Sequence, residues 1–381
     1  MKNTELSAKN CVQHPTIMVC ATEAGSAANL VEILPGLFPI SDVTLFSESG
    51  GRRIFNENDF QVIDSSTIKS VETADQIIEG IRPKVVICGR GIDMQSADRF
   101  LVAAARNQGI PSLVIIDEWY DYSRNFADDH GNLVFCPDVI CCPDWQAKNE
   151  AISEGLASDR LYVTGSPAYA AVVDKVATFT QQAPPLPVFL QGSYLRPVIL
   201  FISEDTAVEK SVQNGDDLSW KKSPRATDSE SKIREGLIRA LHRVGEKCTV
   251  VERPHPSRRA DFRLSVSELE NVSWRISSQD TLATVIWHCD LVIGIRSAAL
   301  LTASLMAKPT LSYQPELRGE NQCTAVRKGI TQAATNSTDL ADWLVAHWSA
   351  KANSEVIQPE FSRKDASTRV LSLIQSLLDR A

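Results

Sequence analysis

The sequence lacks two features that would assign the chain directly to the membrane proteins or to the nucleic-acid binders. It contains no apolar run of the roughly 18 to 20 residues that a membrane-spanning helix needs. It also contains no long run of lysine and arginine, and its formal net charge is −8. A general nucleic-acid binder carries a basic surface that attracts phosphates. We therefore expect neither a transmembrane segment nor nucleic acid as a partner.

The N-terminal end lacks the pattern of a secretory signal. The first fifteen residues, MKNTELSAKNCVQHP, are polar and contain no apolar core. They predict a flexible tail at residues 1–15 and a cytoplasmic location. In a chain without a leader, the nine cysteines are expected to be reduced thiols.

The cysteines also lack the spacing of a metal site. Cys136, Cys141 and Cys142 cluster in FCPDVICCPD, but they form no C-x-x-C pair, and no second cysteine or histidine pair lies nearby. Cys141 and Cys142 belong to an apolar, strand-like run. Buried free cysteine behaves as a small hydrophobic residue, so we expect packing here, and no metal.

The chain does contain a repeated alternation of short apolar runs and helical segments. The apolar run 16–21 leads through a Gly/Ser turn into a helical segment at 27–34, the usual opening of a doubly wound α/β domain. The turn is not G-x-G-x-x-G, so it predicts no dinucleotide site. SESGGRR at 47–53 predicts a loop between two strands.

The length of the chain and a proline-rich segment near its middle predict two domains. At 381 residues with 43% hydrophobic content, the chain is long enough for two cores. We expect a Rossmann-like domain at 16–176, a proline-rich linker at 177–197, a second Rossmann-like domain at 198–355 and a C-terminal helix at 356–381. The predicted fold class is α/β, with two Rossmann-like domains facing across a cleft.

An acidic and aromatic segment, DEWYDYSRNF, follows the apolar run 110–116 of the first half. Ligands of open α/β sheets bind beyond the carboxyl ends of the strands. Asp117 and Glu118 are therefore candidates for a general base or for hydrogen bonds to a sugar, although loop carboxylates are often simply solvated.

Three further residues of this segment are candidates for substrate binding. Trp119 and Tyr122 can stack on a sugar ring, and aromatic packing at a domain interface explains them equally well. Arg124 can neutralise a phosphate, or it can pair with Asp121 or Asp128.

The turn after the first strand is a candidate for the acceptor side of the site. It contains Glu23, Gly25 and Ser26. The alternative is an ordinary turn between a strand and a helix, which needs the same small residues.

The segment 280–315 of the second half reads as helix, buried strand, turn, helix and strand. Gly294 closes the first of these strands, and Arg296 and Ser297 stand in the following turn. Backbone N–H groups at such a turn, with an arginine and a hydroxyl, suit a phosphate. An ordinary crossover with a surface serine remains the alternative.

Arg253 and His255 lie at the end of another predicted strand, in the sequence Arg253-Pro-His-Pro256. Arg253 is a candidate for phosphate binding. His255 can bind a phosphate or act as acid or base, or it can be a structural residue of the turn.

These motifs resemble a known superfamily. The element Gly294-Ile-Arg-Ser297, followed by Leu300-Leu301 and Ala307-Lys308-Pro309, resembles the C-terminal domain of GT-B glycosyltransferases. It is also similar to their relatives, the non-hydrolysing UDP-N-acetylglucosamine 2-epimerases, lipid A disaccharide synthases and wall-polymer glycerophosphotransferases. In the first half, Pro137-Asp138 and Val163-Thr-Gly-Ser-Pro167 resemble bacterial surface-carbohydrate proteins of this group.

The resemblance implies a GT-B-like enzyme of surface polysaccharide or glycoconjugate synthesis. Such an enzyme transfers a sugar from a nucleotide-sugar donor to a carbohydrate or lipid-linked acceptor, without a resident cofactor or a required metal. The alternatives are a sugar-nucleotide 2-epimerase or hydrolase, and a non-catalytic binding protein. The resemblance also allows peripheral membrane association and homo-oligomers.

The chain departs from the family pattern at two positions. Thr302 stands where the family has a glutamate that binds the nucleotide ribose, and Ala307 stands where it has a glycine. A threonine cannot accept hydrogen bonds from two ribose hydroxyls in the way that a carboxylate does. Thr302 is kept as a nucleotide-binding candidate.

Overall fold

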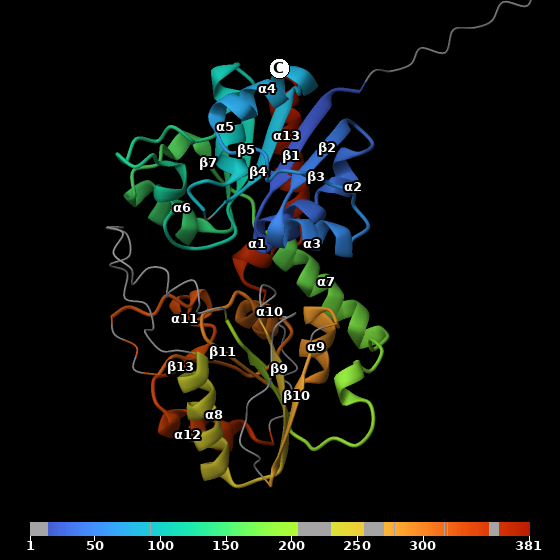
Figure 1. The fold of residues 1–381 in the computed structure, drawn as a ribbon, viewed down its shortest axis with the longest axis vertical. Coiled ribbons are helices and arrows are strands. Elements are labelled where there is room, and N and C mark those ends of the chain that lie inside the picture. The colour runs from blue at the N-terminus through green and yellow to red at the C-terminus, as the bar shows by residue number, and fades with distance from the viewer. Residues whose placement is uncertain are drawn as a thin grey trace, which may run out of the picture. The chain divides into compact units, whose positions relative to one another are not determined.

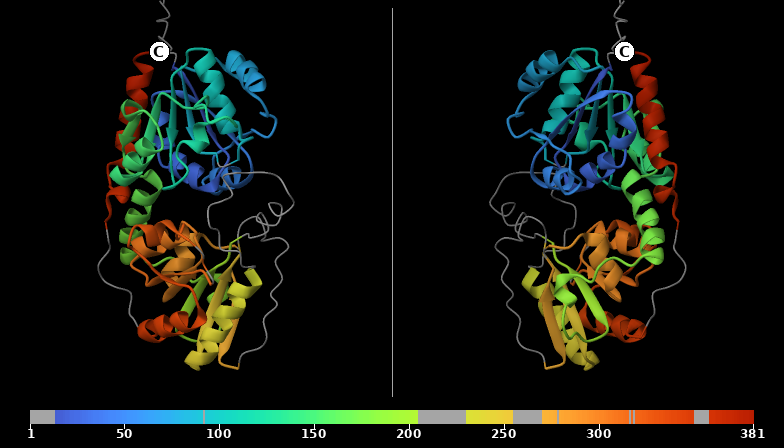
Figure 2. Two further views of the ribbon diagram at one scale, coloured as in Figure 1. Left: turned by 90° about the vertical axis from the view of Figure 1, so that its left-hand side faces the viewer. Right: turned by 90° about the vertical axis from the view of Figure 1, so that its right-hand side faces the viewer.

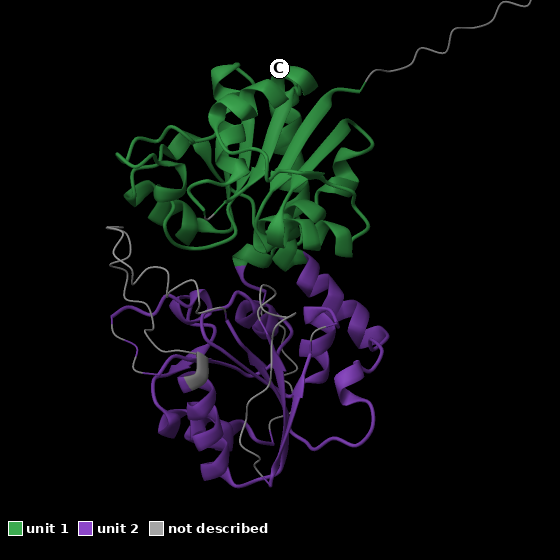
Figure 3. Cartoon of the chain, in the orientation of Figure 1, with its two compact units in different colours: residues 1–170, 360–381 green, residues 171–359 purple. Residues whose placement is uncertain are grey.

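The computed structural model describes residues 14–91, 93–204, 230–254, 270–277, 279–315, 317, 319–349 and 358–381. These residues form two compact units (Figure 3). Unit 1 comprises the chain up to residue 170 together with residues 360–381, and unit 2 comprises residues 171–359.

Unit 1 is built on a fully parallel sheet with the strand order β3-β2-β1-β4-β5-β6-β7 (Figure 1). The central strands are apolar along their whole length because helices cover both faces of a parallel sheet. The strands are β1 (Thr16–Ala21), β2 (Asp42–Ser47), β3 (Ile63–Asp64), β4 (Val85–Gly89), β5 (Ser112–Ile115), β6 (Val139–Cys142) and β7 (Leu161–Val163).

The helices of unit 1 form a layer on each face of this sheet. Residues of α1, α2, α3 and α13 share one core with the strands, whereas α4 and α5 pack against each other. These helices are α1 (Ala24–Val31), α2 (Leu34–Leu37), α3 (Ser49–Glu57), α4 (Val71–Ile81), α5 (Ala97–Asn107), α6 (Trp145–Ser153) and α13 (Ala366–Leu378).

The C-terminal helix α13 belongs to unit 1, although the chain passes through unit 2 before reaching it (Figure 2). Val370, Ile374 and Leu377 are buried in the core of unit 1. Their spacing places them on one face of the helix. Removal of this helix would therefore expose part of the first core rather than the second.

The loop predicted at 47–53 is wrong, because α3 spans Ser49–Glu57. The two glycines lower the helix propensity of this segment, which explains the wrong prediction. A Cβ atom at Gly51 would lie 2.2 Å from the carbonyl oxygen of Ala21. Glycine therefore permits α3 to pack against the end of β1.

Unit 2 has a second parallel sheet, with the strand order β10-β9-β8-β11-β12-β13. Its strands are β8 (Val198–Ile202), β9 (Cys248–Arg253), β10 (Val272–Ile276), β11 (Leu291–Gly294), β12 (Thr310–Tyr313) and β13 (Gln332–Ala334). Its helices are α7 (Pro167–Gln181, which starts in unit 1), α8 (Glu230–Val244), α9 (Leu282–His288), α10 (Ala299–Leu305), α11 (Thr324–Arg327) and α12 (Ser337–His347).

The core of unit 2 lies under α8 and α12. Leu237 and Leu241 of α8 and Leu340 and Leu344 of α12 share a buried cluster with alternate side chains of β8, β9, β11 and β12. Both units are therefore doubly wound α/β domains, as the sequence predicts.

Candidate active site

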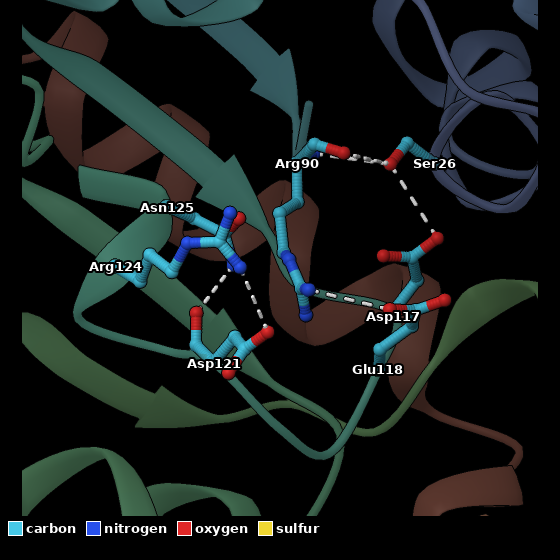
Figure 4. Close-up of polar contacts among 7 residues, drawn as sticks. All are labelled: Ser26, Arg90, Asp117, Glu118, Asp121, Arg124 and Asn125. Carbon is cyan, nitrogen blue, oxygen red and sulfur yellow. Dashed lines mark hydrogen bonds and ion pairs between the residues drawn. The ribbon is translucent and has the colours of Figure 1, made fainter. Parts of the chain in front are cut away.

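The candidate residues of unit 1 gather where the order of its strands reverses. The chain runs from β1 outwards to β3 and then returns to the other side of β1 with β4. Ligands of doubly wound sheets bind at this switch point, beyond the carboxyl ends of the strands. Ser26 follows β1, Arg90 follows β4, and Asp117 and Glu118 follow β5; Figure 4 shows these four side chains grouped together.

Arg90 is the buried cation of this group. Its side chain is 2% exposed, and its Nη2 atom lies 3.2 Å from Oε2 of Glu118. The guanidinium carbon lies 5.3 Å from the centre of the Tyr120 ring. Within the described part of the chain, Nε and Nη1 of Arg90 are buried without a hydrogen-bond partner. These two donors suit an ordered water or an oxygen atom of a ligand.

Asp117 lies against the first turn of α1. Its Oδ2 atom is 3.4 Å from Oγ of Ser26, and a Cβ atom at Gly25 would lie 2.3 Å from that same oxygen. Removal from water, and then the negative charge of Glu118, raise the pKa of Asp117 to about 7, while the charge of Arg90 limits the rise. A carboxyl group that titrates near neutral pH can both accept and donate a proton.

Glu23 adds a third carboxyl group to the site. Burial, followed by the negative charges of Glu118 and Asp93, raises its pKa. Arg90 opposes this rise. The arrangement therefore surrounds one buried guanidinium with several carboxyl groups, which suits proton transfer and hydrogen bonding to hydroxyl groups.

Asp98, in the first turn of α5, is a further buried carboxyl group next to the end of β1. It accepts a hydrogen bond from Oγ1 of Thr22 at 2.5 Å and another from the Thr22 backbone N–H at 3.2 Å. Burial raises the pKa of Asp98 to about 7, and the hydrogen bonds from Thr22 limit the rise. Asp98 and Arg90 also line a cavity of about 10 Å³, which has room for one water.

Sequence reasoning missed both Arg90 and Asp98. Arg90 carried a weak signal, because it stands between Gly89 and Gly91 directly after a buried strand. Asp98 carried none, since an acidic residue in the first turn of a helix is usually a solvated side chain that complements the helix dipole.

The aromatic candidates Trp119 and Tyr122 are both 1% exposed. The Trp119 Nε1–H group donates to the carboxylate of Asp144 at 3.0 Å, and the Tyr122 hydroxyl donates to Glu150 at 2.9 Å. Both rings are buried by packing within unit 1, and stacking of Trp119 or Tyr122 on a sugar stays a prediction. They anchor the segment that carries Asp117 and Glu118.

Arg124 pairs with Asp121, with 3.3 Å between its Nη1 atom and Oδ2 (Figure 4). This is one of the two local ion pairs that the sequence allowed. Its side chain is 25% exposed, so binding of a phosphate by Arg124 stays a prediction.

The phosphate candidates of unit 2 also lie at a switch point, between β8 and β11. Gly294 ends β11. The backbone N–H of Arg296 donates to Glu204, which follows β8, and the Nε atom of Arg296 lies 3.6 Å from Oε2 of Glu204. Oγ of Ser297 accepts the Ala299 N–H at 3.2 Å. A carboxylate therefore already occupies the turn predicted to bind phosphate. Glu204 stands in a polar run directly after a strand, but its pairing with Arg296 could not be predicted from the sequence.

The other described candidates of unit 2 stand on two further elements, and Arg253 pairs with the end of β8 next to Glu204. Thr302 lies half-buried on α10. Arg253 ends β9 and is buried, and its Nη1 atom donates to Oγ of Ser277 at 3.3 Å and to the carbonyl oxygen of Asp280 at 2.9 Å. His255 lies outside the described residues, so its role stays a prediction.

Cys136, Cys141 and Cys142 are buried thiols, as the sequence predicts. Burial raises the pKa of Cys142 to about 12, which disfavours the thiolate that a metal requires. Within the described ranges, no three His, Cys, Asp or Glu side chains are grouped closely enough to hold a metal ion. None of the helices in these ranges has the length and apolar composition needed to cross a bilayer.

The chain matches no protein-family model and no curated protein sequence. Solved structures, in contrast, resemble it over nearly its whole length. A putative UDP-N-acetylglucosamine 2-epimerase from Listeria monocytogenes aligns over 97% of this chain and 98% of its own, with a TM-score of 0.66 and 17% identity. The UDP-GlcNAc 2-epimerase from Neisseria meningitidis, bound to UDP-GlcNAc, aligns over 95% and 100%, with a TM-score of 0.67 and 14% identity.

A glycosyltransferase of kitacinnamycin is also similar, over 96% of this chain and 99% of its own, with a TM-score of 0.59 and 13% identity. At these identities the likeness concerns the fold. The chain has the fold shared by GT-B glycosyltransferases and UDP-N-acetylglucosamine 2-epimerases, with two Rossmann-like domains, as the sequence motifs predict.

Proposed function

We propose that the protein is an enzyme that acts on a nucleotide-activated sugar and breaks the bond between the sugar and the diphosphate. The observation that carries this proposal is the group formed by Asp117, Glu118 and Arg90 at the switch point of unit 1. It supplies a carboxyl group that titrates near neutral pH. The structural similarity to proteins that bind UDP-GlcNAc supports the substrate class.

The first candidate reaction is transfer of the sugar to an acceptor. An acceptor hydroxyl attacks the anomeric carbon, a general base takes its proton, and the nucleoside diphosphate leaves. In this proposal the carboxylate of Asp117 is the base, and Glu23 and Ser26 contribute to the acceptor side. The acceptor is a carbohydrate or a lipid-linked carbohydrate.

Unit 2 binds the nucleotide in this proposal. The backbone N–H and the guanidinium of Arg296 already bind one carboxylate, that of Glu204. The diphosphate of a nucleotide would take the place of this carboxylate. Donors fixed in advance also stabilise the negative charge that grows on the leaving diphosphate.

The second candidate is epimerisation or hydrolysis of the nucleotide sugar. The observation that favours it is that the Listeria and Neisseria structures are UDP-GlcNAc 2-epimerases, one of them putative. In epimerisation the same carboxyl group would move a proton on the sugar itself, and in hydrolysis it would take a proton from the water that attacks the anomeric carbon. No acceptor would be needed.

The test is an incubation of the purified protein with UDP-GlcNAc and with other common UDP, CDP and GDP sugars, with and without a mixture of acceptors. Phosphorus and proton NMR measure free nucleoside diphosphate and the configuration of the sugar. Diphosphate release only with an acceptor supports transfer. An epimeric sugar, or diphosphate release without an acceptor, supports the second candidate. Nucleotide binding without turnover would contradict both and leave a binding protein.

A further inference from the structure

The side chain of Arg90 is positively charged and almost completely buried, with 2% of its surface exposed. A guanidinium does not lose its proton in a protein, and a buried cation needs a negative partner. Glu118, at 3.2 Å, provides that partner. Glu118 therefore carries a negative charge in the folded protein.

Ser26 lies between the backbone of Arg90 and the carboxyl group of Asp117. Its Oγ atom accepts the N–H of Arg90 at 3.0 Å and donates its single proton to the carbonyl oxygen of Arg90 at 3.0 Å. Oδ2 of Asp117 lies further away, at 3.4 Å. The Ser26 hydroxyl lies within donating distance of both the Arg90 carbonyl oxygen and Oδ2 of Asp117, and the shorter distance is to the carbonyl oxygen.

The charged and titratable groups around Asp117 come from three segments. Glu23 approaches from the turn after β1, Arg90 from the end of β4, and Glu118 and Tyr120 from the loop of Asp117 itself. Arg90 is positive, but Glu118 already neutralises it. Within the described part of the chain, no lysine or arginine forms an ion pair with Asp117.

We infer that Arg90 decides which carboxyl group of this pair holds the proton: its ion pair keeps Glu118 ionised, and Asp117 gains and loses the proton. Arg90 is then a positioning residue, which acts through the two carboxyl groups. This inference deepens the proposed function, because it names Asp117 rather than Glu118 as the acid–base group of the site.

Titration of the aspartate side chains tests this inference without any substrate. The protein is labelled with 13C at the aspartate carboxyl carbons, and NMR spectra are recorded from pH 4 to pH 9. The Asp117 signal is identified by its loss in Asp117→Asn. We expect it to titrate near neutral pH in the unaltered chain.

Two single substitutions should then move the Asp117 midpoint in opposite directions. Glu118→Gln removes a negative neighbour and should lower the midpoint by about one pH unit, whereas Arg90→Gln removes the positive neighbour and should raise it. Arg90→Lys keeps the charge and should leave the midpoint close to that of the unaltered chain. A merely structural role of Arg90 predicts no such opposite signs and no rescue by lysine.

Three results would overturn the inference: an Asp117 midpoint near 4, no movement in Glu118→Gln, or movement in the same direction in both variants. If Arg90→Gln does not fold, Arg90→Lys and Glu118→Gln still decide the outcome. The proposed function is refuted by a different result from the one that refutes this inference. If the titrations follow this pattern and no nucleotide sugar is turned over, the inference stands and the proposed activity does not.

Discussion

Replacement of Asp98 with asparagine should make unit 1 less sensitive to pH, and more stable than the unaltered chain at pH 8. Asp98 is 1% exposed, and burial raises its pKa to about 7. An aspartate in an unfolded chain titrates near about 3.9. The folded protein therefore holds a proton between about pH 4 and pH 7 that the unfolded chain has released.

The sign and size of the effect follow from this difference. Because the folded pKa of Asp98 is raised, its contribution to stability is fully present below about pH 4 and is lost as the pH rises through about 7. Three pH units at about 1.4 kcal/mol each give a loss of about 4 kcal/mol, as an upper value. Asparagine is neutral at every pH and can still accept the hydrogen bonds from Thr22, so the variant escapes this loss.

Hydrogen exchange followed by mass spectrometry measures the effect within unit 1. The free energy of opening of β1 and β4 is compared at pH 5 and pH 8 in the unaltered chain, in Asp98→Asn and in the exposed control Asp129→Asn. We expect the stability difference between Asp98→Asn and the unaltered chain to be larger at pH 8 than at pH 5, by up to about 3 kcal/mol in favour of the variant. Equal pH dependence in all three proteins would refute the reasoning.

Four further substitutions, at Gly25, Arg296, Thr302 and Ala307, give testable predictions. Gly25→Ala places a Cβ atom 2.3 Å from Oδ2 of Asp117, so it should displace that carboxyl group and reduce turnover at least tenfold, while circular dichroism and Tm change little. Arg296→Ala should abolish binding of UDP in calorimetry, and Thr302→Glu should strengthen it; unchanged affinity in Arg296→Ala would remove the phosphate-site assignment. Ala307 has a left-handed φ of 56°, so Ala307→Gly should stabilise unit 2 by about 1 kcal/mol, and a lower Tm would contradict this.

The fold was largely predictable because the central strands of both sheets are short, mostly apolar runs. β1, β4, β8 and β11 are short runs of buried residues, and such runs stand out in a sequence. α3 was not predictable, because its glycines serve a close approach to β1 that only the folded chain reveals. β13 and α11, with three and four residues, are too short to show a period.

The location of candidate residues was predictable where a polar cluster follows a strand. Asp117 and Glu118 fitted that pattern. Arg90 did not, because it is a single charged residue whose partner, Glu118, is distant in the sequence. Glu204 also stands in a polar run after a strand, but its pairing with Arg296 appears only in the folded chain. The burial of Trp119 was also hidden, since its partner Asp144 lies on another element. The sequence predicts which residues lie at the ends of strands, but the partners and the burial of their side chains depend on tertiary packing.

At Ala307 the backbone conformation explains a feature of the sequence pattern. The superfamily pattern has glycine at this position, and the left-handed φ explains why glycine suits it. The sequence alone showed the departure from the pattern but not its reason.

The most direct test of the central claim is the release of nucleoside diphosphate from a nucleotide sugar by three proteins: the unaltered chain, Asp117→Asn and the control Asp121→Asn. Asp121 lies on the same segment, but its side chain is 49% exposed and pairs with Arg124. We predict release by the unaltered chain and by Asp121→Asn, and a loss of at least a hundredfold in Asp117→Asn. Equal release by all three proteins would contradict the assignment of the active site. If no nucleotide sugar is cleaved or epimerised, with or without acceptors, the proposed activity is contradicted.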